Sequence, residues 1–150
     1  MIGGRALLEK TICSNVSLPF PLEELILLML GYQDSLIAAG VTMPEIVDIR
    51  VNNGCVVVLS EDGGPNLVDR YVTPRRFITA PEKPVAEIVA ILKIVIDAGL
   101  SIDPHVKNFV GEAGKLLYVD MSPPLTGSYV AGRLSLATED REFQILKDNF

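Results

Sequence analysis

The chain has 150 residues, of which 49% are hydrophobic and 21% are charged, so its composition excludes a disordered segment and fits one globular domain. The formal net charge of −6 argues against binding to nucleic acid or to an anionic membrane through bulk charge. This net charge is still compatible with the binding of an anionic small molecule that is held by a few local cations or by a metal ion.

The cysteine pattern and the apolar runs bear on the compartment. Cys13 and Cys55 fit no zinc-binding spacing, and although the two could pair, nothing indicates a disulfide framework. We therefore expect reduced thiols. The longest apolar run is too short to span a bilayer, and the first residues lack the apolar stretch of a signal peptide. These features predict a cytoplasmic protein that binds neither membrane nor nucleic acid.

The chain begins with a predicted strand and a predicted helix. Residues 4–12 are typical of a short strand. Residues 21–39 predict a helix, because proline suits its first turn and Gly40 suits its C-terminal end. Glu23 and Glu24 favour the positive end of its dipole. Its apolar stripe contains Leu22, Leu25, Ile26, Met29, Leu36 and Ile37.

A β-hairpin follows. Residues 46–60 alternate between apolar and polar side chains and then become apolar throughout, which is typical of a half-buried strand followed by a buried one. Asn53 and Gly54 offer the two positive φ angles of a type I′ turn. The irregular segment 61–72 then leads into a short helix or turn.

The second half of the chain predicts a second helix and a second hairpin. Residues 84–98 form the helix, with Gly99 at its C-terminal end. We expect its core-facing residues to be Val85, Ile88, Val89, Leu92, Val95 and Ile96. Residues 108–120 form the hairpin, with Gly111 and Gly114 in its loop.

The order of these elements indicates the fold class. Thr138 could cap a last helix that carries Phe143 and Leu146. Runs of helix and antiparallel strand in this order indicate an α+β fold rather than a doubly wound parallel sheet. We expect one domain over residues 1–150.

One polar pattern stands out from this order. The segment "DPHVKN" places Asp103 two residues before His105 and five before Asn108, and the apolar hairpin that follows ends at Asp120. Together with the order of elements, this pattern resembles the protein-kinase-like fold, most of all its small-molecule branch of aminoglycoside and choline phosphotransferases. The resemblance covers roughly residues 10–124.

The resemblance implies a kinase-like core with an abbreviated C-lobe. Its N-lobe would cover about residues 1–62 and its C-lobe about residues 63–150. In such a domain Asp103 would orient the acceptor hydroxyl and take its proton, while Asn108 and Asp120 would bind magnesium through hard oxygen atoms.

The resemblance also implies a nucleotide site that holds ATP. Lys10, on the strand before the first helix, would pair with the phosphates. Its helix partner would be Glu24 or Glu23. The implied activity is ATP- and magnesium-dependent phosphoryl transfer to the hydroxyl of a small-molecule acceptor. No glycine-rich loop precedes Lys10.

Two alternatives stay open. The chain could be a kinase-like binding or regulatory module without turnover, or an unrelated α+β interaction domain. In the plainest interpretation Asp103 caps a turn beside Pro104, Asn108 fills another turn position, and His105 is a structural hydrogen-bonding residue.

Two surface features complete the expectations. Tyr71, Arg75 and Arg76 could form an acceptor or phosphate patch, although the sequence favours a solvated turn for them. The helix at residues 84–98 is apolar over much of its circumference, and the mean hydropathy of the chain is +0.36. We therefore expect a homo-oligomer or a missing partner domain.

Overall fold

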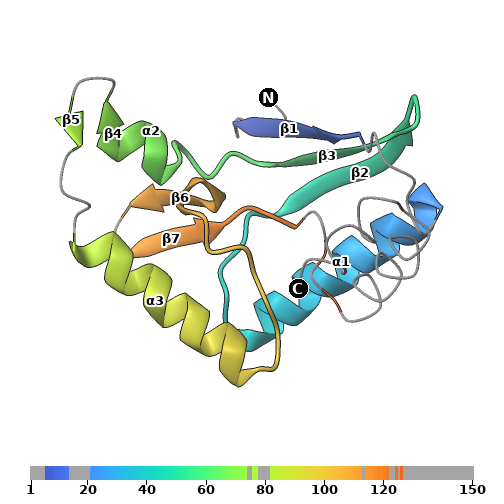
Figure 1. The fold of residues 1–150 in the computed structure, drawn as a ribbon. Coiled ribbons are helices and arrows are strands. Elements are labelled where there is room, and N and C mark those ends of the chain that lie inside the picture. Colours follow the sequence, from blue (N-terminus) through green and yellow to red (C-terminus); the bar gives the residue numbers. More distant parts are fainter. Residues whose placement is uncertain are drawn as a thin grey trace, which may run out of the picture.

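The computed structural model describes residues 6–13, 21–73, 76–77, 82–112, 114–121, 124 and 126, without the side chains of 70–77. These residues form small antiparallel sheets and long helices around a shared hydrophobic core (Figure 1). The α+β class is thereby confirmed. The predicted helix from Thr138 and the side chains of Tyr71, Arg75 and Arg76 lie outside what the structure describes.

The largest sheet contains three antiparallel strands in the order β1-β3-β2. They are β1 (Leu7–Ile12), β3 (Cys55–Glu61) and β2 (Ile46–Asn52), and the central β3 is the most buried. The predicted hairpin between β2 and β3 is confirmed, because Asn53 and Gly54 both have positive φ angles, of 48° and 75°. This is the backbone that a type I′ turn requires.

Helix α1 (Leu22–Ala39) packs on this sheet and ends as predicted. Gly40 has a φ of 102°, and its N–H donates to the carbonyl oxygen of Ile37. Glycine tolerates this left-handed conformation, which is why it ends the helix. The buried face consists of Leu25, Met29, Tyr32, Gln33 and Leu36. Tyr32 and Gln33 were absent from the predicted stripe, and Ile37 is half exposed.

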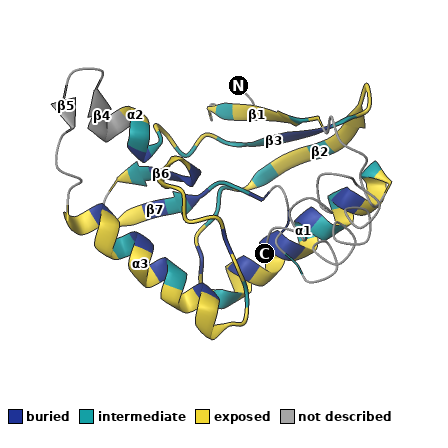
Figure 2. Cartoon of the chain, viewed as in Figure 1, coloured by how far each residue is buried: buried dark blue, intermediate teal, exposed yellow. Residues whose placement is uncertain are grey.

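Helix α3 (Glu82–Asp97) begins two residues before its predicted start and presents a different face to the core. The buried residues are Pro84, Ile88, Ile91 and Val95. The prediction that Val85, Val89 and Ile96 face the core is wrong, because they are 44%, 58% and 69% exposed. The exposed residues form a band along α3 (Figure 2). The expected homo-oligomer or partner domain stays a prediction.

The remaining elements are short, and they lie either between the sheet and α3 or after α3 in the chain. They are α2 (Leu67–Tyr71), the pair β4 (Val72–Thr73) and β5 (Arg76–Phe77), the 3-10 turn η1 (Val106–Asn108), and the hairpin β6 (Phe109–Glu112) and β7 (Lys115–Tyr118). Gly114 lies in the turn of that hairpin as predicted. Gly111 lies within β6 instead, and its Cβ would stand 2.7 Å from the carbonyl oxygen of Lys115.

The predicted reduced thiols are wrong. A disulfide joins Cys13, just beyond β1, to Cys55 at the start of β3, and the Cα atoms are 4.5 Å apart. Antiparallel pairing brings the two residues together, because Ile12 pairs with Val56 at the same end of the strands. Disulfides are typical of oxidising compartments, and cytoplasmic localisation stays a prediction. Within the described residues, no helix has the length and apolar character needed to cross a membrane.

One carboxylate of α3 holds the turn between β6 and β7. Glu87 accepts backbone hydrogen bonds from Gly114 at 2.6 Å and from Leu116 at 2.8 Å, one on each oxygen. These charge-assisted bonds join the hairpin to the helix. They also satisfy two backbone donors at a turn where the ladder cannot do so.

We expect Glu87→Gln to lower the free energy of unfolding by about 1–2 kcal/mol, because a side-chain amide has one acceptor oxygen instead of two. Urea denaturation would measure the loss. Glu82→Gln, in the exposed first turn of the same helix, removes the same charge and should have a smaller effect. Equal losses in the two variants would show that charge, not the two bonds, is responsible.

Candidate functional site

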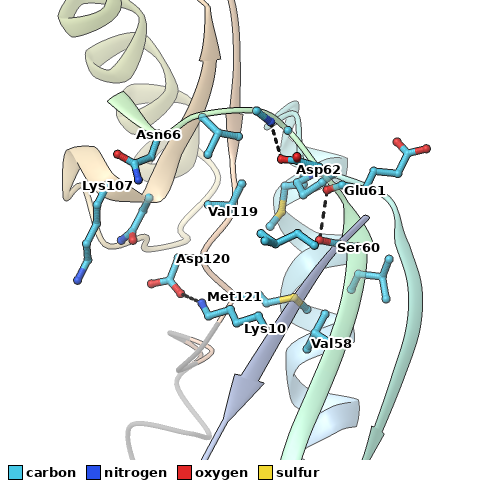
Figure 3. Close-up of a pocket in the computed structure, with 18 of the residues that line it drawn as sticks. Lys10, Val58, Ser60, Glu61, Asp62, Asn66, Lys107, Val119, Asp120 and Met121 are labelled. Atoms are coloured by element: carbon cyan, nitrogen blue, oxygen red, sulfur yellow. Dashed lines mark hydrogen bonds and ion pairs between the residues drawn. The ribbon is translucent and has the colours of Figure 1, made fainter. Parts of the chain in front are cut away.

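A cavity of about 670 Å³ lies between the three-stranded sheet and the β6–β7 hairpin. Its size is within the range of small-molecule sites. The sheet contributes apolar residues such as Leu8 and Val58, and Val110 and Val119 lie on the hairpin side. Figure 3 shows polar side chains from both sides around this space, among them Lys10, Asp62, Lys107 and Asp120.

The connection after β3 forms one wall of the cavity and packs tightly on the hairpin. A Cβ atom at Gly63 would stand 2.4 Å from a methyl carbon of Val110, so only glycine permits this approach. The N–H of Gly111 donates to Pro65, and Asn66 forms a β-bridge with Val110. The backbone therefore holds sheet and hairpin at a fixed separation on this side.

Lys10 and Asp120 form an ion pair within the cavity. The Nζ atom of Lys10 lies 2.9 Å from Oδ1 of Asp120, and the Asp120 side chain is 15% exposed (Figure 3). Lys10 lies on β1 opposite Val58, and Asp120 lies two residues after β7. The fold thus brings together two of the predicted site residues that are 110 positions apart in the sequence.

Asn108 lines the same cavity from η1 and is 6% exposed. Its side-chain Nδ2 donates to the carbonyl oxygen of Asp103 at 3.3 Å, which leaves Oδ1 as its acceptor atom. Its own carbonyl oxygen accepts a hydrogen bond from Val119 at 2.9 Å. That bond continues the β6–β7 pairing to the residue before Asp120, so Asn108 and Asp120 lie at the same end of the hairpin.

Asp103 is placed differently from these residues. It is exposed, and among the described residues it is not part of the cavity lining. Its Oδ1 accepts a hydrogen bond from the backbone of His105 at 3.0 Å, and the Nδ1 of His105 accepts one from Lys107. These bonds agree with the plainest interpretation of the sequence, in which Asp103 caps a turn and His105 is a structural hydrogen-bonding residue.

Glu24 does not meet Lys10. It lies exposed in the first turn of α1, and the described lining of the cavity does not include it. Gln33, two and a half turns further along the helix, lines the cavity instead, and its Nε2 donates to Pro44 at 3.2 Å. The position of a helix residue relative to the sheet depends on packing, which the spacing from Lys10 does not reveal.

Two buried tyrosines lie beneath the loop that carries Asp103. The Tyr32 hydroxyl donates to the carbonyl oxygen of Ser101, and the Tyr118 hydroxyl accepts a hydrogen bond from the backbone of Asp103 at 3.2 Å. Burial, with smaller contributions from the carboxylates of Asp120 and Asp103, raises the pKa of Tyr32 to about 12, and a hydrogen bond with Tyr118 opposes this rise. Burial, followed by the charge of Tyr32, raises the pKa of Tyr118 strongly. Both phenols are therefore neutral at ordinary pH.

Charge is unevenly distributed around the cavity. Lys10 and Lys107 lie near Asp120, whereas Glu61 and Asp62 lie at the end of β3 (Figure 3). Asp69 also lines the cavity from α2, which contacts η1, and Asn66 caps α2 by accepting from the Asp69 backbone at 2.8 Å. The separation of the two lysines from Glu61 and Asp62 suits an elongated ligand with an anionic group near the lysines and hydrogen-bond donors near the carboxylates at the end of β3.

The residues present fit a magnesium ion that is shared with a phosphate. Asn108 and Asp120 offer one amide oxygen and one carboxylate, which are hard ligands. Magnesium commonly takes one or two protein ligands and completes its octahedron with water and phosphate oxygens. Within the described residues, no cluster of three or more His, Cys, Asp or Glu side chains could hold a metal ion. A metal site here would therefore depend on the ligand.

The chain was compared with protein-family models, with curated proteins and with solved structures, and none of the three comparisons found a match. What the protein does is therefore inferred from the chemistry of its cavity. The sequence did not point to Lys107, Gln33 or Asp69. Of these three residues, only Lys107 could have been found from the sequence, because it directly precedes Asn108.

Proposed function

We propose that the protein binds ATP with magnesium in this cavity and transfers the terminal phosphoryl group to a hydroxyl of a small molecule. The observation that carries the proposal is the Lys10–Asp120 ion pair in a cavity that Asn108 also lines. A lysine on a strand, a loop asparagine and a carboxylate after a hairpin are the groups that kinase-like phosphoryl transfer uses.

The proposed site has a part for each end of the nucleotide. Leu8, Val58 and Val119 offer apolar surface for a base, and the carboxylates at the end of β3 suit hydroxyl and amine donors. Lys10 would bind phosphate oxygens, and Asn108 and Asp120 would hold the metal ion. When bound, that ion would neutralise the charge that develops on the phosphates.

The chemical step requires a base outside the metal site. The acceptor oxygen forms a bond to the terminal phosphorus while the bond from phosphorus to the bridging oxygen breaks, and ADP leaves. Asp103 would take the hydroxyl proton. Its side chain is exposed, so an acceptor can approach it from solvent, and its backbone carbonyl accepts a hydrogen bond from Asn108. The buried tyrosines would hold the backbone that leads into it, at the Ser101 carbonyl and at the Asp103 N–H.

A nucleotide-binding module without turnover is the second candidate. The Asp103 carboxylate already caps the turn at His105, and it lies outside the described cavity lining. A base that is held by its own loop has less freedom to meet an acceptor. Binding without transfer would leave the functions of Lys10, Asn108 and Asp120 unchanged.

The test is a thermal-shift titration with ATP and magnesium, separately and together. We expect the pair to raise the melting temperature most, since a ligand at about 100 times its Kd stabilises the folded state by about 2.7 kcal/mol. Asp120→Asn should remove most of the magnesium-dependent part, measured against the variant's own baseline. Asp34→Asn, an exposed change on α1, should behave like the parent.

Two results would contradict the proposal. A parent protein whose melting temperature is unmoved by ATP, with or without magnesium, does not bind nucleotide in this way. A full magnesium-dependent shift in Asp120→Asn would remove Asp120 from the metal site. Transfer itself is measured by ADP release with pooled small-molecule alcohols, and Asp103→Asn should abolish any activity that is found while leaving the thermal shift intact.

A further inference from the structure

Lys107 is the second cation of the cavity, and its backbone is held firmly. It lies in η1 directly before Asn108, and its N–H donates to Nδ1 of His105 at 3.2 Å. The residue is exposed and lines the cavity. Across the described part of the chain, no hydrogen bond or ion pair engages its ammonium group. The backbone is thus positioned while the charged group can still meet a ligand.

The two lysines of the cavity differ in what they already contact. The Lys10 ammonium is paired with Asp120 at 2.9 Å, so much of its charge is compensated. In the view of Figure 3, Asp120 lies between Lys10 on the sheet and Lys107 on η1, and an ion pair joins it to Lys10 alone of these two lysines. For a ligand anion beside Asp120, the available positive charge is therefore that of Lys107, because the charge of Lys10 is already compensated by Asp120.

The direction of the ligand follows from the remaining charges. Glu61 and Asp62 lie at the end of β3, where a phosphate would be repelled. The phosphate chain must then extend toward Asp120, and its terminal group comes closest to η1. A lysine suits this position, since its flexible stem carries a compact charge with three donors.

We propose that Lys107 binds the terminal phosphate of the nucleotide and makes the cavity prefer a triphosphate over a monophosphate. This inference rests on the proposed function, because it assumes that the cavity holds a nucleotide. Lys107 contacts the group that is transferred, whereas Lys10 contacts the inner phosphates beside the metal ion. Removing its charge should therefore weaken binding of ATP without affecting binding of AMP.

Calorimetric titration tests this with ATP and with AMP, each with magnesium, on the parent and three variants. We expect Lys107→Gln to bind ATP about tenfold more weakly, as the loss of one charge-assisted hydrogen bond implies, and to bind AMP as the parent does. Lys107→Arg should restore part of the ATP affinity. Lys93→Gln removes the same charge from the exposed side of α3 and should match the parent.

The outcomes separate this inference from the proposed function. If the parent binds ATP more tightly than AMP and Lys107→Gln does the same to the same degree, the assignment of Lys107 is wrong and the proposed function stands. If Lys107→Gln loses ATP and AMP equally, Lys107 supports the loop rather than a phosphate, and the inference is wrong. If the parent binds neither nucleotide, both are wrong.

Discussion

Reduction of the Cys13–Cys55 disulfide is expected to lower the free energy of unfolding by about 4 kcal/mol. The two cysteines are 42 positions apart, and opening a loop of this length restores that much chain entropy to the unfolded state. The free energy of unfolding of a domain is typically about 5–15 kcal/mol, so this loss is a large part of it. Urea denaturation with and without a thiol reductant measures it.

The double variant Cys13→Ser with Cys55→Ser is the control for this experiment. It should unfold at the urea concentration at which the reduced parent unfolds, and the reductant should not change that concentration. A parent with the same unfolding midpoint in both conditions would show that the bond does not form in solution or does not constrain the unfolded chain.

Alkaline pH is expected to destabilise the protein through its two buried tyrosines. An unfolded tyrosine loses its proton near pH 10, whereas the pKa of Tyr32 in the folded protein is about 12. Between these values the folded state binds more protons than the unfolded state, so the free energy of unfolding falls as pH rises. The stabilising contribution of Tyr32 is fully present below pH 10 and is lost as the pH rises toward 12. Tyr32 alone should cost about 2 kcal/mol between pH 9 and pH 12.

The comparison with phenylalanine variants isolates these groups. Tyr32→Phe should be less stable than the parent at pH 8, because the hydrogen bond to Ser101 is lost. Its stability should then fall less steeply above pH 10. Tyr118→Phe should act in the same direction, since burial raises the pKa of its phenol as well. Parallel pH profiles in the parent and both variants would show that neither tyrosine is responsible.

Part of the candidate site could be predicted from the sequence. Asn108 and Asp120 were selected by their spacing and the hairpin between them, Lys10 was implied by the resemblance to the kinase-like fold, and the structure brings all three to one cavity. The proximity of Asn108 and Asp120 was the easiest feature to predict, because a short hairpin returns the chain to its starting point. Their roles toward a nucleotide stay a prediction until binding is measured.

The rest of the site depends on packing between distant elements. Glu24 was chosen as the partner of Lys10, yet the rotation of α1 on the sheet turns Gln33 toward the cavity. Helix α3 shows the same difficulty, because apolar residues surround much of it. Its sequence therefore permits several buried faces, and the core selects the one with Ile88, Ile91 and Val95.

The sequence by itself determined the features that neighbouring residues control. Asn53 and Gly54 specify the turn between β2 and β3, and Gly40 ends α1, because positive φ angles are a local property of the backbone. Only the tertiary structure decided which distant residues meet. The strand order β1-β3-β2 joins Cys13 to Cys55, and the closing of the hairpin against the sheet joins Lys10 to Asp120. Such contacts depend on the register and packing of whole elements, which no short stretch of sequence contains.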